Sequence, residues 1–225
     1  MMQRQGGPSL PGAMVDPLAC GGQVGIDTAQ RATGDVMDDW TGQVLARFSD
    51  AVGKRIQEGM PPSKADLAEL LVEVQSDEGV RDEAPGGETP EYRVVIRVHR
   101  RPPSGVAPPV TQHAGDLAGD LLGLEEATPS GVHGLFVYFT DEAMAGYLSN
   151  PDNGLRRFYD LRPGEAHLLT SRFFESRPKS FRDRLKRPAV DVRAESLLKR
   201  DYPRGYALRI WEVVATAAGR EAPPA

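Results

Sequence analysis

The sequence predicts an α+β protein, with a small mixed sheet of about three or four strands, packed helices, and a helical hairpin before the sheet. The first observation is a nine-residue apolar run at Val132–Thr140, whose length and Val, Phe and Tyr content favour a strand. Its apolar residues do not alternate with polar ones, which indicates a strand buried on both faces. The second is a strand pattern at 92–100, and the third is helical periodicity before and after it.

These patterns divide the chain into five regions. We expect a disordered tail at 1–34, a helical hairpin at 35–76, an acidic linker rich in Pro and Gly at 77–91, an α+β domain at 92–217 and a second disordered tail at 218–225.

The hairpin prediction depends on two apolar stripes. In the first helix, apolar residues recur every four positions at Trp40, Val44, Phe48, Val52 and Ile56. Ser63 then provides a typical helix start, because its hydroxyl can accept from free N–H groups of the first turn. The second stripe follows at Leu67, Leu70, Leu71 and Val74.

A crossover unit is expected next. The strand at 92–100 has one largely polar face, which places it near an edge of the sheet. The helix expected at 111–126 has an apolar leucine face, with Asp116 and Asp120 opposite. Because this helix joins two strands of one sheet, we expect those strands to be parallel and their connection right-handed.

The remaining segments are expected to be mostly helical. Short helices are predicted after the central strand, then one from Arg162 through Phe174 and another at 192–199. A third strand is predicted at 206–214, where apolar and aromatic residues return.

Composition limits the classes of function. The chain of 225 residues has a single cysteine, Cys20, which excludes an intramolecular disulfide and a cysteine-based zinc cluster. We find no apolar run long enough to span a bilayer and no signal-peptide pattern, and expect a cytoplasmic protein without a membrane partner. Charge is uneven: residues 1–90 hold 15 Asp+Glu against 7 Lys+Arg, whereas residues 151–209 hold 15 Lys+Arg against 8 Asp+Glu. This asymmetry is typical of an interaction surface.

Local motifs for chemistry are absent. The sequence has no phosphate-binding P-loop, no dinucleotide-binding glycine pattern, no nucleophile elbow and no zinc-binding His-Glu-x-x-His. We therefore expect no cofactor and assign no catalytic residue or metal ligand from the sequence.

A basic segment at 177–187 is the main candidate for binding. Its cations are Arg177, Lys179, Arg182, Arg184, Lys186 and Arg187. On a helix, Phe181 and Leu185 would dock inward together while part of the basic row points outward. Such a row can bind an acidic protein surface or phosphates, and it can equally be a solvated face paired with the chain's own acids.

The leading hypothesis is a non-enzymatic interaction protein, an accessory or assembly subunit of a larger cytoplasmic complex. It would use the basic segment and the hairpin as contact faces. One alternative is a nucleic-acid-binding protein that contacts phosphates through the same segment. The other is an enzyme whose site forms only in three dimensions, from His99, His133, Glu165 and His167.

Overall fold

A computed structural model describes residues 38–76, 92–100, 110–129 and 132–214. The tails and the linker expected at 1–34, 77–91 and 218–225 lie outside these residues. The helices are α1 (Asp38–Gln57), α2 (Lys64–Ser76), α4 (Val110–Ala127), α5 (Glu142–Leu148), α6 (Arg156–Tyr159), α7 (Ser171–Glu175) and α8 (Lys179–Arg182), with single 3-10 turns η2 (Pro151–Asn153) and η3 (Pro203–Gly205). The strands are β1 (Tyr92–His99), β2 (His133–Thr140), β3 (Ala166–Leu169), β4 (Val192–Asp201) and β5 (Ala207–Val214).

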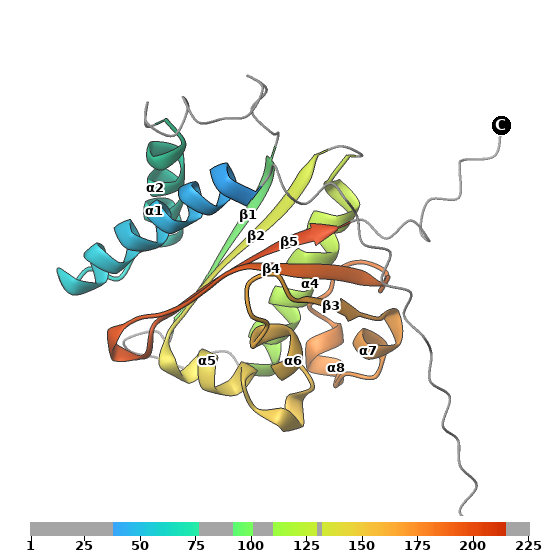
Figure 1. Ribbon diagram of the computed structural model, residues 1–225. Coiled ribbons are helices and arrows are strands. Elements are labelled where there is room, and N and C mark those ends of the chain that lie inside the picture. Colours follow the sequence, from blue (N-terminus) through green and yellow to red (C-terminus); the bar gives the residue numbers. More distant parts are fainter. Residues whose placement is uncertain (1–37, 77–91, 101–109, 130–131, 215–225) are drawn as a thin grey trace, which may run out of the picture. The chain divides into compact units, whose positions relative to one another are not determined.

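The α+β class is confirmed. Five strands form one mixed sheet in the order β1-β2-β5-β4-β3 (Figure 1). The strand expected at 132–140 is β2, an interior strand, while the middle position belongs to β5, and the expected edge strand is β1. The pair β1–β2 is parallel, as the strand–helix–strand order predicted, and the other three pairs are antiparallel.

Two segments predicted to be helical contain the strands β3 and β4. With them the sheet has five strands, instead of the three or four expected. In β4, Val192, Ala194 and Ser196 are buried and alternate with less buried neighbours, which is the period of a strand and not of a helix. The helix predicted from Arg162 through Phe174 is divided into the four-residue strand β3 and the separate one-turn helix α7. Backbone hydrogen bonds to β4 hold the turn that precedes β3, and these long-range contacts outweigh the local helical pattern.

The two faces of the sheet carry separate cores. Phe136 and Tyr138 pack with α4 and the short helices, whereas Val137 and Phe139 pack with the hairpin, so successive residues of β2 face opposite sides. Trp211 of β5 stacks on Phe136 with 6.0 Å between the ring centroids. The continuous apolar run of β2 therefore reflects burial on both faces.

The helical hairpin packs its apolar stripes against the sheet. Its buried members are Val44, Leu45, Phe48, Val52, Ile56, Leu67, Leu70 and Leu71. The side chain of Trp40 lies outside the described part of the chain. The sheet of the same chain therefore covers the apolar stripes, so these stripes are not free to contact a partner. The prediction that the hairpin is a contact face then applies only to its other sides.

The backbone of the basic segment lies very close to two glycines of α4. A Cβ added to Gly115 would stand 2.5 Å from the carbonyl oxygen of Phe181, and one added to Gly119 would stand 2.9 Å from that of Arg184. Phe181 and Leu185 are both buried, as expected, although the helix α8 ends at Arg182. Backbone packing and two apolar anchors therefore fix this segment on α4.

None of the helices among the described residues has an apolar stretch that is long enough to cross a membrane.

Candidate metal centre

The histidines considered in the sequence do not gather in one place. His99 ends β1 and His133 begins β2, and the parallel register pairs them with Thr140 and Tyr92 respectively, at opposite ends of the two strands. His133 instead lies 2.6 Å from a carboxylate oxygen of Glu212 on β5. His167 is on β3, at the far edge of the sheet. The site expected from His99, His133, Glu165 and His167 is therefore wrong as a set.

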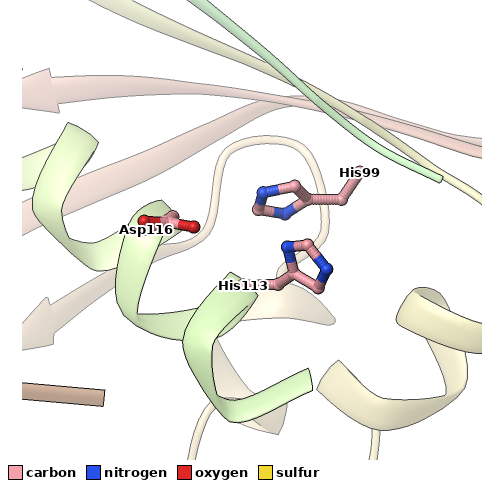
Figure 2. A group of neighbouring side chains, drawn as sticks. All are labelled: His99, His113 and Asp116. Atoms are coloured by element: carbon pink, nitrogen blue, oxygen red, sulfur yellow. The ribbon is translucent and has the colours of Figure 1, made fainter. Parts of the chain in front are cut away.

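His99 converges instead with His113 and Asp116 of α4. Each of the three offers one potential ligand atom, and these atoms lie within 4.8 Å of one another. The centroids of the two imidazole rings are 4.5 Å apart, with an interplanar angle of 51°. Figure 2 shows the three side chains directed toward a common region between the end of β1 and the beginning of α4.

The crossover connection explains this convergence. The chain leaves β1 at His99 and returns as α4, so the first turns of α4 lie near the carboxyl end of β1. His113 and Asp116 are three residues apart on this helix and share a face. At the end of β2, the backbone N–H of Asp141 donates to the carbonyl of His99 at 3.2 Å. The cluster thus lies at the carboxyl ends of the parallel pair, where open α/β sheets commonly bind ligands.

Both imidazoles are held in the neutral form. His99 is 6% exposed, and burial, followed by repulsion from a protonated His113 and from Arg97, lowers its pKa to about 3. Burial also lowers the pKa of His113. A metal ion binds the neutral imidazole, so these ligands need not lose a proton at pH 7.

Tyr138 contacts His99 through its hydroxyl group. The phenol oxygen lies 2.8 Å from Nδ1 of His99, and burial raises the pKa of the phenol well above its usual value. When Nδ1 carries the proton and donates to this oxygen, Nε2 keeps a lone pair for a ligand. A hydrogen bond of this kind, which fixes the ring and its tautomer, is usual behind metal-binding histidines.

Asp116 is already engaged by a residue of the basic segment. Nε of Arg184 donates to Oδ1 at 2.8 Å, and a terminal nitrogen donates to Oδ2 at 3.0 Å. One turn later on α4, Arg97 of β1 forms a similar fork with Asp120, at 2.5 and 2.6 Å. Each oxygen of Asp116 retains a second lone pair, which a metal ion can use.

Other cations of the basic segment also have contacts within the chain. Lys179 pairs with Asp183 at 3.2 Å, and Arg187 pairs with Glu126 of α4. The guanidinium of Arg177 lies over the ring of Phe173, 4.5 Å from its centroid.

Two cations of the segment remain. Arg182 and Lys186 are exposed, and neither has an ion-pair partner in the part of the chain that the structure describes. The structure therefore divides the six predicted contact residues into four with internal contacts and two that are directed to solvent.

A cleft with a volume of about 320 Å³ lies between α5 and the ends of β4 and β5. Both cations that line it are paired, Lys199 with Asp160 at 3.4 Å and Arg209 with Asp201 at 2.7 Å. Both cations of the cleft therefore already have an acidic partner, which reduces their attraction for an anionic ligand. We consider the cleft a weaker candidate than the histidine cluster.

Sequence reasoning missed His113 and Asp116 as site residues. The available signal was a His-x-x-Asp pattern on the helix that follows a strand ending in histidine. A comparison with known proteins adds no further information, since no family model, curated protein or solved structure matches the chain.

Proposed function

We propose that the protein binds a divalent first-row transition-metal ion through His99, His113 and Asp116. The main support for this proposal is that three potential ligand atoms, one from β1 and two from α4, lie within 4.8 Å of one another. Two imidazoles and one carboxylate form a ligand set used for Zn²⁺ and for Fe²⁺. The proposal is related to the enzyme alternative considered from the sequence, because both include His99. The other residues of that alternative are replaced by His113 and Asp116.

Metal binding requires the three ligand atoms to move closer together than in the metal-free arrangement. Ligand atoms at about 2.0–2.1 Å from a tetrahedral Zn²⁺ lie roughly 3.3 Å apart. His113 is only partly buried, so its side chain can rotate toward the other two ligands. Three protein ligands leave at least one coordination position for water or a substrate, which is the pattern of catalytic and not of closed structural sites.

Calorimetric titration of tag-free protein, first treated with a chelator and dialysed, tests the proposal. We expect one equivalent of Zn²⁺ to bind, and Co²⁺ to give visible absorption bands that report its coordination geometry. His113→Ala is the informative variant because this side chain is partly exposed, and His167→Ala on β3 is the matched control. We expect the first to weaken zinc binding by more than about tenfold, since even losses of outer hydrogen-bonding partners weaken metal sites 10- to 100-fold.

The proposal is refuted if the unmodified protein shows no saturable binding of either metal below millimolar concentration. It is also refuted if His113→Ala and His167→Ala bind zinc equally well.

A second candidate function is docking of the basic segment on an acidic protein surface, such as another subunit of a complex. Its support is the exposure of Arg182 and Lys186, because a cation without an ion-pair partner among the described residues is available to an outside one. Changing both to Ser should reduce recovery of the partner, and mostly by slowing association. Recovery of the same partners at the same salt concentration would rule this out, whereas a steep salt dependence of nucleic-acid binding would favour phosphate contact instead.

A further inference from the structure

Arg184 connects the basic segment to the proposed metal centre. Its guanidinium holds both oxygens of Asp116, at 2.8 and 3.0 Å. The two side chains differ in exposure, at 42% for Arg184 and 12% for Asp116. The acid is therefore shielded, while its cationic partner has direct access to solvent.

The guanidinium can leave Asp116 without displacement of the segment that carries it. The backbone on either side of Arg184 is fixed by its close approach to Gly115 and Gly119 and by the buried side chains of Phe181 and Leu185. None of these contacts involves the guanidinium. Rotation of the exposed Arg184 side chain is therefore separable from the packing of the segment on α4.

A metal ion and Arg184 compete for the same negative charge. Asp116 is the one carboxylate of the triad, and Arg184 already holds both of its oxygens. A guanidinium and a divalent cation on one carboxylate repel each other across a short distance, in surroundings that are partly shielded from water.

We propose that Arg184 acts as a resident cation which occupies Asp116 in the metal-free protein and is displaced when a divalent metal binds. This inference rests on the proposed metal-binding function and names how that site is regulated. The displaced guanidinium then becomes available to solvent beside the exposed Arg182 and Lys186. Because coupling between two binding events is reciprocal, an anionic ligand that captures Arg184 increases the affinity of the site for metal.

Zinc titration of two matched variants tests the inference. Arg184→Gln removes the competing charge, whereas Arg187→Gln makes the same change in the same segment, where the partner is Glu126 near the other end of α4. We expect Arg184→Gln to bind zinc about 10- to 100-fold more tightly than the unmodified protein, the range that corresponds to a charge-assisted hydrogen bond. Arg187→Gln should bind zinc with nearly the original affinity.

A second measurement follows the guanidinium directly. In nitrogen-15 NMR spectra, the Nε–H signal of Arg184 should move toward the position of a solvated arginine as zinc is added, and it should not move in His113→Ala.

The outcomes separate the two proposals. If neither the unmodified protein nor Arg184→Gln binds zinc, the metal function fails and this inference fails with it. If both bind zinc but Arg184→Gln binds no more tightly, only the inference is overturned. Weaker binding by Arg184→Gln would then show that Arg184 orients Asp116 as a supporting hydrogen-bond donor.

Discussion

The buried imidazole of His99 makes a quantitative prediction about stability at acid pH. Its pKa is about 3 in the folded protein, against the usual value of 6.5 that applies to the unfolded chain. Between these values the unfolded state binds a proton that the folded state does not, so stability falls as the pH falls through this window. The slope approaches about 1.4 kcal/mol per pH unit, which amounts to a loss of about 2 kcal/mol between pH 7 and pH 5 from this residue alone.

The prediction is tested by comparing the unmodified protein with His99→Gln, a variant that does not titrate. Urea unfolding should be followed by tryptophan fluorescence at several pH values from 7 to 4.5, with a chelator present so that bound metal does not add stability. Other titrating groups, including His113, contribute to both proteins, and the difference between the two pH profiles isolates His99. We expect the free energy of unfolding of His99→Gln to decrease less steeply below pH 6.5.

Tyr138→Phe provides the matched control, because it removes the 2.8 Å hydrogen bond to His99 but leaves the histidine buried. It should lower stability at every pH and retain the steep acid dependence. If His99→Gln and the unmodified protein lose stability in parallel between pH 7 and 5, the reasoning about the buried neutral imidazole is incorrect.

The remaining predictions concern two helical glycines with opposite surroundings. Gly119→Ala on α4 should lower the free energy of unfolding by about 1–3 kcal/mol, because the new Cβ would lie 2.9 and 3.1 Å from backbone oxygens that cannot easily move. Gly146→Ala on α5 should raise the free energy of unfolding by about 0.5–1 kcal/mol, because no described atom beyond the neighbouring helix backbone lies within 4 Å of its added Cβ. Thermal and urea denaturation of both variants would contradict these expectations if Gly119→Ala were as stable as the unmodified protein, or if Gly146→Ala were destabilised.

Strong local patterns in the sequence correctly indicated the main elements. The apolar run at Val132–Thr140 predicted a strand buried on both faces, and β2 is an interior strand of the sheet, between β1 and β5, with core residues on each side. The strand–helix–strand order predicted the parallel pair β1–β2. These inferences succeeded because side-chain periodicity is a local property, and because a strand–helix–strand connection within one sheet brings its two strands parallel.

The same reasoning failed where long-range pairing decides the local structure. The segment at 192–199 was predicted to be a helix, but in β4 its backbone pairs with β5 on one side and β3 on the other. Likewise, the basic row could not be matched to its acids in advance, because Arg184 and Asp116 are 68 residues apart in the chain.

The sequence by itself therefore determined the α+β class, the doubly buried strand at 132–140, the hairpin stripes and the absence of known local motifs for catalysis. Only the tertiary structure decided which histidines meet. His99 and His133 lie on neighbouring strands, yet the parallel register separates them by the length of those strands. His113 and Asp116 reach His99 because the crossover returns α4 past the end of β1. Hydrophobic periodicity indicates which side of a helix or strand is buried. Which polar side chains come together depends on the register of the strands and on how they are connected, and these are properties of the folded sheet.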